Sequence, residues 1–299
     1  MTSSDFGDRA GVTSAGSRRG GLRAVATRAE LLAMVGDDPF LRYDVLPRPE
    51  RAWALGDAVA VTRIGHRGQR GISAWVRPPD DYRAGALLDA AGEQRLDALL
   101  AALLGRGGAE RGVAGVSVPL GSAHVLERHA RTGGGGDWEW MWTRWEPPAY
   151  GLEDALVELS DVADADEIAA LAAAENPLFE GEPGTGRSER WLGVRDPTGR
   201  VVACGARHRT RAGAPHLSGI LVATAVRGRG YGRAITGALT RESVRAEGVC
   251  TLGMYADNDV ARGLYHSLGY VTAHAWSSRR LAEPPRGRTA AASSRRLTH

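Results

Sequence analysis

Residues 226–235 read VRGRGYGRAI, and this stretch decides how the fold of the surrounding chain is interpreted. Its three glycines, Gly228, Gly230 and Gly232, alternate with Arg or Tyr between a β-like run and a helix-like run. Because glycine has no Cβ and tolerates positive φ, such a loop lets the backbone approach a ligand closely. The N–H groups that open a helix bind anions, helped by the helix dipole. The stretch therefore predicts either a phosphate-binding loop or a tight strand-to-helix turn with solvated arginines.

The hydrophobic pattern around this loop predicts a mixed α/β fold, in which helices flank a mixed sheet. After a linker at 146–151, we expect the order β-α-β-β-β-loop-α-β-α-β. The predicted elements are strand 155–160, helix 161–176, a hairpin over 190–209, strand 215–223, a helix from the loop to Glu247, strand 250–256, helix 258–269 and strand 271–281.

Two motifs in this half resemble those of the GNAT superfamily, the acyl-CoA-dependent N-acetyltransferases. The family's Arg/Gln-x-x-Gly-x-Gly/Ala loop is matched by Arg227, Gly230 and Gly232. The family's Asn-x-x-Ala-x-x-x-Tyr-x-x-x-Gly-Phe/Tyr pattern is matched, in order, by Asn258, Ala261, Tyr265, Gly269 and Tyr270. The resemblance covers about 155–281 and implies a GNAT-like fold in the C-terminal half.

The resemblance implies that the glycine loop binds the pyrophosphate of acetyl-CoA, the acyl donor. In the family, the strands before the loop and after its helix splay apart, and the pantetheine arm lies in the gap. The residues that this implies for acetyl-CoA binding are Leu221, Val222, Arg227, Gly228, Arg229, Gly230, Tyr231, Gly232, Arg233 and Asn258. From the residues alone, Arg229 and Arg233 can equally be solvated, and Asn258 can simply cap a helix.

The implied reaction is direct transfer of the acetyl group to a primary amine, without a covalent enzyme intermediate. By resemblance, Tyr265 is the general acid near the departing sulfur; the alternative is a tyrosine packed in the core. For the base we choose His216, ahead of Glu189 and His208, because an imidazole titrates in the useful range. His216 and Ser218 are expected to share a strand face with Ile220 and Val222. No metal is expected.

The composition of the chain excludes several classes of protein. The chain contains no lysine, so a Walker-type P-loop and a Schiff-base enzyme are both excluded. Cys204 and Cys250 lie in apolar runs and are expected to be reduced thiols rather than nucleophiles. With no apolar run of membrane-spanning length and no secretory h-region in the sequence, we expect a cytoplasmic protein without membrane association.

The basic residues gather at the two ends. Residues 1–25 hold four Arg and two Asp, and residues 279–299 hold six Arg and one Glu, so the ends carry +7 and the body between them −4 within the total of +3. The ends are predicted to be disordered tails, at 1–25 and 282–299. An acidic body argues against a nucleic-acid-binding protein, although the tails are suited to weak contact with anionic polymers.

Residues 153–189 hold eleven acidic residues and a single basic one, Arg187. In the family this region borders the acceptor site, so an acidic mouth would favour a cationic amine. The alternative is ordinary solvation of a helix. We expect a small-molecule amine as acceptor, with a protein N-terminus or side chain as a second choice. The glycine-rich loop 177–188 is a candidate lid.

The N-terminal half, 26–150, is predicted to be a second α/β domain that accompanies a GNAT domain at 151–281. Its expected elements are helix 27–36, strands 52–64 and 71–79, helix 84–105, strand 112–120, a short helix at 121–131 and an aromatic strand at 138–148. It lacks the glycine loop and the Asn…Tyr pattern, so it is either a degenerate copy of the same fold or an unrelated accessory domain. Its tryptophans, at alternate positions, are expected to pack a core or an interface rather than to line an acceptor pocket.

Other functions stay open at this point. A non-catalytic acyl-CoA sensor would keep the loop without needing Tyr265. A dinucleotide-binding site needs Gly-x-Gly-x-x-Gly within a βαβ unit, which the spacing of these glycines does not match. The sequence leaves a homodimer open.

Overall fold

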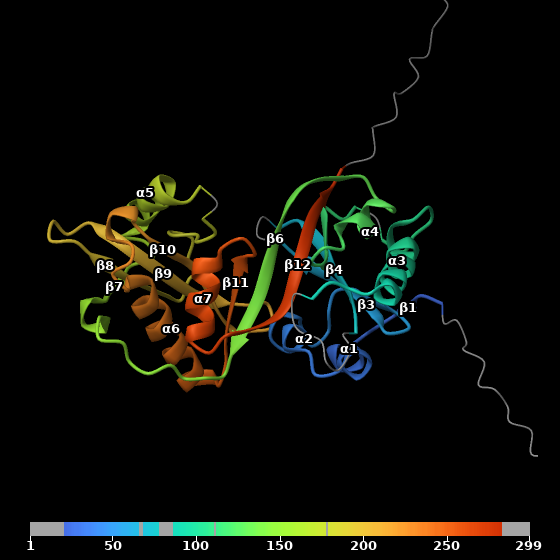
Figure 1. The fold of residues 1–299 in the computed structure, drawn as a ribbon, viewed down its shortest axis with the longest axis horizontal. Coiled ribbons are helices and arrows are strands. Elements are labelled where there is room, and N and C mark those ends of the chain that lie inside the picture. The colour runs from blue at the N-terminus through green and yellow to red at the C-terminus, as the bar shows by residue number, and fades with distance from the viewer. Residues whose placement is uncertain (1–20, 66–67, 78–85, 111, 178, 283–299) are drawn as a thin grey trace, which may run out of the picture.

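A computed structural model describes residues 21–65, 68–77, 86–110, 112–177 and 179–282. Their strands form one twelve-stranded mixed sheet in the order β1-β2-β3-β4-β5-β12-β6-β11-β10-β9-β8-β7, with helices on both faces (Figure 1). The predicted mixed α/β fold is confirmed.

In the N-terminal half, the elements are β1 (Arg23–Ala24), α1 (Arg28–Val35), α2 (Pro39–Asp44), β2 (Ala52–Leu55), β3 (Ala58–Ile64), β4 (Arg70–Val76), α3 (Ala90–Leu104), β5 (Gly115–Pro119), α4 (Ala123–Glu127) and β6 (Thr132–Thr143). The single strand expected at 52–64 is wrong, because Gly56 has a φ of 63° and turns the chain into a hairpin of β2 and β3. Strand β1 lies within the tail predicted at 1–25, because it pairs with β2 and Val25 is buried. Residues 1–20 of that tail, and the tail at 282–299 beyond its first residue, lie outside the described residues.

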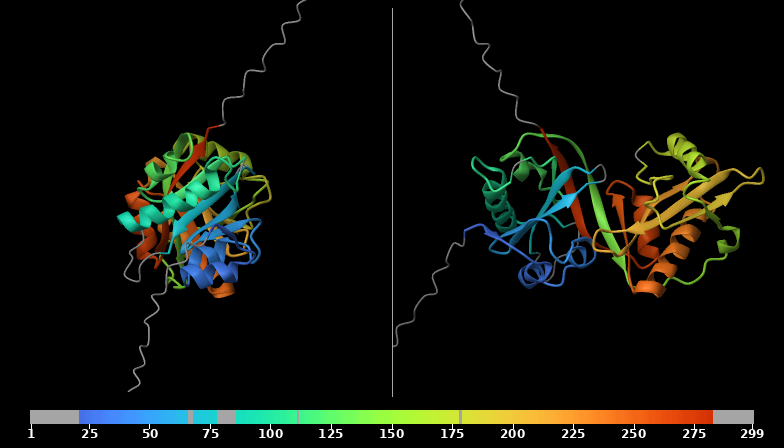
Figure 2. Two further views of the ribbon diagram at one scale, coloured as in Figure 1. Left: turned by 90° about the vertical axis from the view of Figure 1, so that its right-hand side faces the viewer. Right: turned by 180° about the vertical axis from the view of Figure 1, so that it is seen from behind.

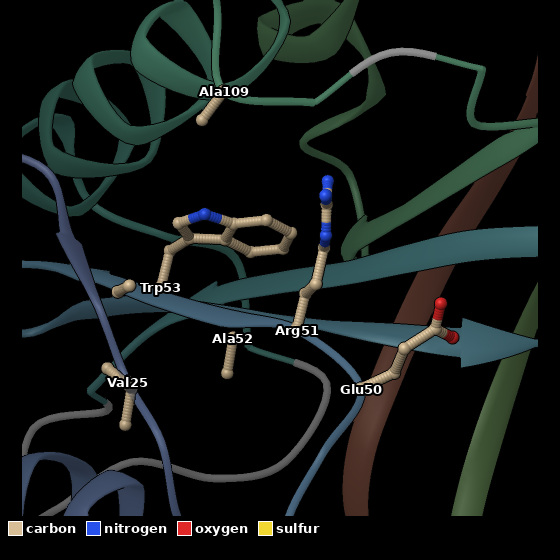
Figure 3. Close-up of a pocket in the computed structure, with 7 residues that line it drawn as sticks. Val25, Glu50, Arg51, Ala52, Trp53 and Ala109 are labelled. Carbon is tan, nitrogen blue, oxygen red and sulfur yellow. The ribbon is translucent and has the colours of Figure 1, made fainter.

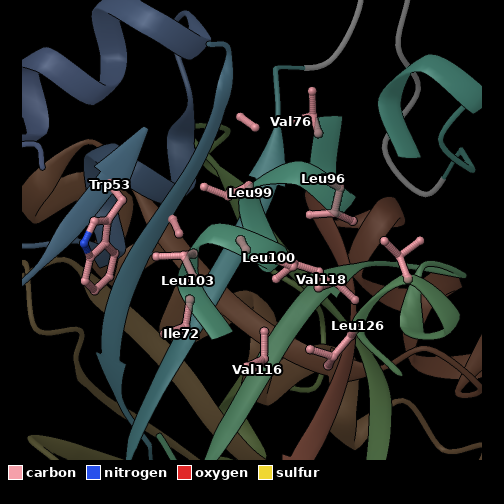
Figure 4. Packing of buried hydrophobic residues seen from close by; sticks show 14 of the residues in the cluster. Trp53, Ile72, Val76, Leu96, Leu99, Leu100, Leu103, Val116, Val118 and Leu126 are labelled. Atoms are coloured by element: carbon pink, nitrogen blue, oxygen red, sulfur yellow. The ribbon is translucent and has the colours of Figure 1, made fainter. Parts of the chain in front are cut away.

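Helix α3 forms because its leucines recur at helical spacing and Asp89 caps its first turn through Gly92 N, at 2.7 Å. Its fully buried leucines are Leu96, Leu99, Leu100 and Leu103. They pack on Ile72 of β4 and Val116 and Val118 of β5 (Figure 4). This cluster is the core on one face of the N-terminal half.

In the C-terminal half, the elements are β7 (Val157–Leu159), α5 (Ala165–Glu175), β8 (Arg190–Arg195), β9 (Val201–Arg209), β10 (Pro215–Val222), α6 (Tyr231–Glu247), β11 (Cys250–Tyr255), α7 (Asp259–Ser267) and β12 (Val271–Leu281), with short 3₁₀ turns at η1 (Glu153–Ala155) and η2 (Thr224–Val226). The predicted order of strands and helices in this half is confirmed. Two clusters divide its core: α6 and α7 pack on one face of the sheet, and α5 packs on the other.

The two halves exchange strands at the middle of the sheet. Strand β6 lies between β11 and β12, whereas β12 lies between β5 and β6. Figures 1 and 2 show these two long strands, β6 in green and β12 in red, between the two groups of helices. A cut after residue 150 would therefore separate β6 from both of its neighbours.

The alternating tryptophans of β6 pack at this junction. Trp140 is 1% exposed and makes an edge-on contact with Phe40 of α2, with ring centroids 5.7 Å apart. The same cluster contains Trp75 of β4 and Trp276 of β12. Helices α1 and α2 cover this face of the sheet, so the aromatic strand packs a core between the two halves, as its alternation predicts.

Candidate functional site

The site begins where β10 and β11 part. Their parallel pairing runs only through His216–Thr251 and Leu217–Leu252. Strand β10 continues to Val222, while β11 continues to Tyr255 paired with β6 instead. Among the described strands, none therefore pairs with the edge of β10 that faces β11 from Ser218 onward. Such an edge offers backbone donors and acceptors to an extended ligand.

A β-bulge lies in β10 at the point of parting. The register with β9 shifts between Ser218 and Leu221, and Gly219 has a φ of 61°. The expectation that Ile220 and Val222 share a face with His216 is wrong, because the extra residue reverses the alternation. Ile220 and Val222 pack with the α6 cluster, and Leu221 packs with the α5 cluster.

The glycine loop leads from this strand into α6. Gly228 and Gly230 have φ values of 77° and 90°, which favour glycine. Gly230 is the N-cap of α6, and no side chain caps this helix. A Cβ on Gly232 would lie 3.5 Å from Val222, so helix and strand approach closely. The first-turn N–H groups of a seventeen-residue helix are thus available to an anion, which fits the pyrophosphate of a coenzyme A ligand.

The arginines of the loop differ in their surroundings. Arg227 donates from Nε to Val222 O at 3.1 Å and pairs with Glu175 of α5 at 3.2 Å. Arg233 donates to Ser267 Oγ at 2.7 Å. Arg229 is exposed and makes no hydrogen bond or ion pair with a described residue. Glu175 thus anchors the start of the loop to α5, and Arg229 has no partner there to displace.

The linker between the halves also reaches this loop. An ideal Cβ on Gly230 would lie 3.1 Å from Leu152 Cδ1 and 3.2 Å from the Tyr150 hydroxyl. The guanidinium of Arg233 lies over the Tyr150 ring, 5.5 Å from its centroid. Ion pairs of Arg241 with Glu153, and of Arg245 with Glu146 at 2.6 Å, hold the linker along α6. Because Tyr150 belongs to no sequence motif, its position beside the glycine loop was not predicted.

Tyr265 lies on α7 in the cluster that contains Leu217, Leu252 and Met254 of the parting strands. The residue is 7% exposed, and burial raises the pKa of its hydroxyl to about 12. The hydroxyl makes no hydrogen bond to a described residue, yet it is not among the buried polar atoms that lack a partner. It therefore retains some solvent access and stays protonated at neutral pH. Asn258 caps α7, because its side-chain oxygen accepts from Ala261 N at 3.0 Å.

His216 lies beside Thr251, the last pair but one before the strands part. Its Nδ1 is 2.9 Å from Thr251 Oγ1, and that hydroxyl donates its proton to Pro215 O at 2.8 Å. Nδ1 therefore carries the ring proton, and Nε2 is left as an acceptor. Burial, and then the nearby charges of Arg63 and Arg187, lower the pKa of His216 to about 3. The imidazole is neutral at physiological pH but is a weak base in this state.

The other candidate bases have partners. Glu189 pairs with Arg209 at 2.8 Å and with Arg207 at 3.7 Å. His208 faces His216 across the sheet, with ring centroids 5.0 Å apart. Since Arg187 donates to His208 Nε2 at 3.3 Å, His208 Nδ1 donates to Ser218 Oγ at 3.1 Å. His208 is buried with both ring nitrogens engaged, whereas Glu189 is exposed and paired with two arginines.

The family models match one part of the chain. Residues 192–281 match the model described as FR47-like protein, and this region contains β10, the glycine loop and Tyr265. The match covers less than half of the chain. A sequence search among curated proteins finds no match.

Solved structures resemble the chain across both halves. A putative GNAT acetyltransferase from Novosphingobium aromaticivorans is 22% identical, with 85% of this chain and 96% of that one covered and a TM-score of 0.46. A GCN5-related N-acetyltransferase from Sphaerobacter thermophilus is 19% identical, with 87% and 95% covered and a TM-score of 0.47. A tandem GNAT protein from the clavulanic acid biosynthesis pathway is 13% identical, with 89% and 99% covered and a TM-score of 0.44. Because these scores lie below 0.5, the site is assigned from this chain's own residues.

The acidic residues that were expected to border an acceptor site are largely ion-paired. Seven of the eleven acidic residues at 153–189 form ion pairs with arginines, all but Glu182 with an arginine outside this stretch: Glu153, Glu158, Asp164, Glu167, Glu175, Glu182 and Glu189. The negative charge read from the sequence is therefore largely compensated in the fold. Near the parting strands, Glu180 instead accepts from the Tyr255 hydroxyl at 3.0 Å, and burial together with Glu180 raises the pKa of Tyr255 to about 12.

Other features of the described residues lie outside this site. A shallow pocket of about 340 Å³ is formed at the β1–β2 edge of the N-terminal half, beside Trp53 and Arg51 (Figure 3). Burial raises the pKa of Cys204 to about 12, so this thiol is a poor nucleophile. Within the described ranges, no helix has the length and apolarity that a membrane span requires, and no cluster of three His, Cys, Asp or Glu side chains could hold a metal.

Proposed function

We propose that this protein is an N-acetyltransferase that moves an acetyl group from acetyl-CoA directly to a primary amine. The observation that carries the proposal is the early end of the β10–β11 pairing, at Leu217–Leu252, next to the uncapped N-terminus of α6. The early end of the pairing leaves a free strand edge on β10, and the N-terminus of α6 offers a site for an anion. A coenzyme A thioester has both an amide-bearing arm and a pyrophosphate, and so matches the pair.

Acetyl-CoA would supply the activated acyl group, and the protein would hold it at two places. Backbone N–H groups at 228–233 would bind the pyrophosphate, with Arg229 free to add charge. The edge of β10 at Leu221 and Val222 would pair with the pantetheine amides. Backbone N–H groups on the same edge are suited to polarise the thioester carbonyl.

The chemistry then requires proton movements at the ammonium, at the forming amide and at the sulfur. For the proton of the acceptor's ammonium, the group that we propose is His216 Nε2; because its pKa is lowered to about 3 in the free protein, this role requires the pKa to rise when the substrates bind. The amine nitrogen attacks the carbonyl carbon, the new C–N bond forms, and the C–S bond breaks. Tyr265 donates a proton to the departing sulfur, and its raised pKa keeps that proton available. The nitrogen then loses its second proton as the amide forms, which restores the Tyr265 hydroxyl by exchange through solvent. The products are an acetamide, the coenzyme A thiol and the one proton taken from the ammonium.

Isothermal titration of acetyl-CoA tests the cofactor site. We expect micromolar binding to the wild type and none to a Gly230→Asp/Gly232→Asp variant, because the carboxylates would repel the pyrophosphate. Gly199→Asp is the matched control, since Gly199 also has a positive φ, 89°, but lies in the β8–β9 turn. A folded wild type that does not bind acetyl-CoA would overturn the proposal.

An amine screen with thiol detection then separates an enzyme from a non-catalytic acyl-CoA sensor. An enzyme releases coenzyme A thiol only when an acceptor is present. Binding of acetyl-CoA without release of thiol for any amine would favour the sensor.

A further inference from the structure

A chain of three hydrogen-bonded side chains, Arg187, His208 and Ser218, ends at the point where β10 leaves β11. Arg187 donates to His208 Nε2 at 3.3 Å, and His208 Nδ1 is 3.1 Å from Ser218 Oγ. Ser218 follows directly after Leu217, the last residue of β10 that pairs with β11. The reaction proposed above uses none of these three side chains.

The positions of the protons in this chain follow from the guanidinium at its start. A guanidinium has no acceptor, so His208 Nε2 accepts from Arg187 and carries no proton. The ring proton is then on Nδ1, and Ser218 Oγ accepts it. The Ser218 hydroxyl thus keeps its own proton to donate, and it makes no other hydrogen bond to a described residue. Since Ser218 is half-buried, an acceptor for this proton is expected from a ligand.

The Ser218 side chain lies on the face of the sheet opposite α6. Leu217 packs with the α6 cluster, so His216 and Ser218, on either side of it, point to the other face. His216 is opposite His208 in the pairing of β10 with β9, and the two rings are 5.0 Å apart. The bulge at Gly219 follows Ser218 immediately. Ser218 therefore lies between the proposed base and the free edge of β10.

The proposed binding of acetyl-CoA determines which group this hydroxyl would meet. The pyrophosphate would lie beyond Val222, at the glycine loop, and the pantetheine arm along the free edge of β10. The acyl end would then lie toward Ser218, where the free edge begins. The carbonyl oxygen of the thioester is an acceptor, and it gains negative charge when an amine attacks. A neutral hydroxyl whose proton is not otherwise used is a suitable donor to that oxygen.

We propose that Ser218 donates a hydrogen bond to the carbonyl oxygen of the thioester, and that His208 and Arg187 are positioning residues that fix the direction of this donor. The proton stays on Ser218, and no covalent bond to Ser218 forms. Because the hydrogen bond strengthens as charge develops on the oxygen, it raises kcat rather than the affinity for acetyl-CoA. This inference rests on the proposed N-acetyltransferase function and adds a side-chain donor to the backbone N–H groups of the same strand edge.

Infrared difference spectroscopy tests this hydrogen bond, with acetyl-CoA isotopically labelled at the carbonyl carbon, because donation to a carbonyl oxygen lowers its stretching frequency. We expect bound acetyl-CoA to absorb at a higher frequency in Ser218→Ala than in the wild type. Ser218→Thr keeps the hydroxyl and should restore the wild-type value. Arg187→Met removes the donor that fixes the His208 tautomer, and should give an intermediate value. Ser243→Ala is the matched control, because Ser243 is buried in α6 and donates to Leu239 O at 2.7 Å.

Steady-state kinetics provide a second measurement. Loss of one oxyanion donor lowers kcat by about 100-fold, and we expect this for Ser218→Ala, with the KM of the amine and the affinity for acetyl-CoA unchanged. Ser218→Thr should recover most of this loss. A raised KM of the amine at unchanged kcat would mean that Ser218 binds the acceptor instead, and would overturn the inference.

The infrared measurement needs no acceptor amine, so it separates this inference from the proposed function. Equal carbonyl frequencies in the wild type and Ser218→Ala, both with acetyl-CoA bound, overturn the inference and leave the cofactor site standing. A wild type that does not bind acetyl-CoA overturns the proposed function, and the inference with it. Should Ser218→Ala fail to fold, Arg187→Met decides, since Arg187 is exposed, and an unchanged frequency in that variant overturns the inference.

Discussion

Tyr265 combines a buried ring with an accessible hydroxyl, and this combination predicts a specific loss. Tyr265→Phe keeps the packing against Leu217 and Met254 but removes the proton donor. We expect kcat to fall by about 100-fold or more, with acetyl-CoA affinity unchanged. Steady-state kinetics together with titration of acetyl-CoA measure the two effects.

The matched control for this prediction is Tyr270→Phe. The Tyr270 ring lies 6.0 Å from that of Tyr265, but its hydroxyl is buried against Thr240, at 2.8 Å. We expect this change to lower stability and to leave kcat nearly intact. Equal losses of kcat in the two variants would argue that Tyr265 acts through packing alone.

The second prediction at the residue scale concerns His216 and the way the free energy of unfolding depends on pH. Its pKa is lowered from 6.5 to about 3, chiefly by burial, so the unfolded chain binds this proton more readily than the folded one. Its contribution to the free energy of unfolding is therefore complete above pH 6.5 and is lost as the pH falls toward 3. One proton corresponds to about 1.4 kcal/mol per pH unit, or up to about 2 kcal/mol between pH 6.5 and 5.

Urea unfolding of the wild type and His216→Gln at pH 7, 6 and 5 checks this. Glutamine cannot titrate, so the variant should lose less stability between pH 7 and 5 than the wild type does. If the two curves run parallel, His216 titrates equally in the folded and unfolded states, and its environment is not the one described.

At the scale of elements, the linker reaches the proposed coenzyme A site through Tyr150. The Tyr150 ring supports Arg233 beside the N-terminus of α6. We predict that Tyr150→Ala weakens acetyl-CoA binding by roughly three- to tenfold, because the guanidinium loses its ring support and the loop one of its neighbours. Tyr150→Phe keeps the ring and should lie close to the wild type.

Titration of acetyl-CoA into both variants measures this effect. Tighter binding by Tyr150→Ala would mean that the linker obstructs the loop rather than supporting it. Unchanged binding would remove Tyr150 from the site.

Elements that carry a motif were predictable, and irregular ones were not. The glycine loop and the α7 motif could be placed because their residues have fixed spacing and their flanking runs show clear periods. The bulge at Gly219 could not, since a register shift depends on pairing with β9 and leaves no mark in the local pattern. That shift moved Ile220 and Val222 to the other face. Helix α2 was also missed, although Asp38 and Pro39 form a regular helix start.

At the scale of the whole molecule, the charge pattern and the chain path both depend on long-range contacts. Residues 153–189 are acidic in sequence, but arginines such as Arg195 and Arg241, distant in the chain, neutralise them. Likewise, nothing local indicates that β12 pairs with β5 and β6. Sequence periodicity identifies a strand but does not specify its neighbours, so the exchange of β6 and β12 could be recognised only from the structure.

The strand exchange predicts that neither half folds alone. A fragment of residues 151–299 lacks β6, which leaves one edge of β11 and both edges of β12 unpaired. Long unpaired edges favour aggregation, and Trp276 would lose its packing against the N-terminal aromatic cluster. We expect this fragment to be insoluble or unfolded, and to bind no acetyl-CoA.

Co-expression of residues 1–150 with residues 151–299 is the positive control for this prediction, because every strand pairing can then form across the break. The cut lies in the linker, next to Tyr150, and interrupts no strand. We expect a soluble complex of the two fragments that binds acetyl-CoA, while each fragment alone does not. If the 151–299 fragment were instead monomeric and folded and bound acetyl-CoA with wild-type affinity, these residues would form an independent domain. The pairing of β12 with β6 would then not be needed for folding.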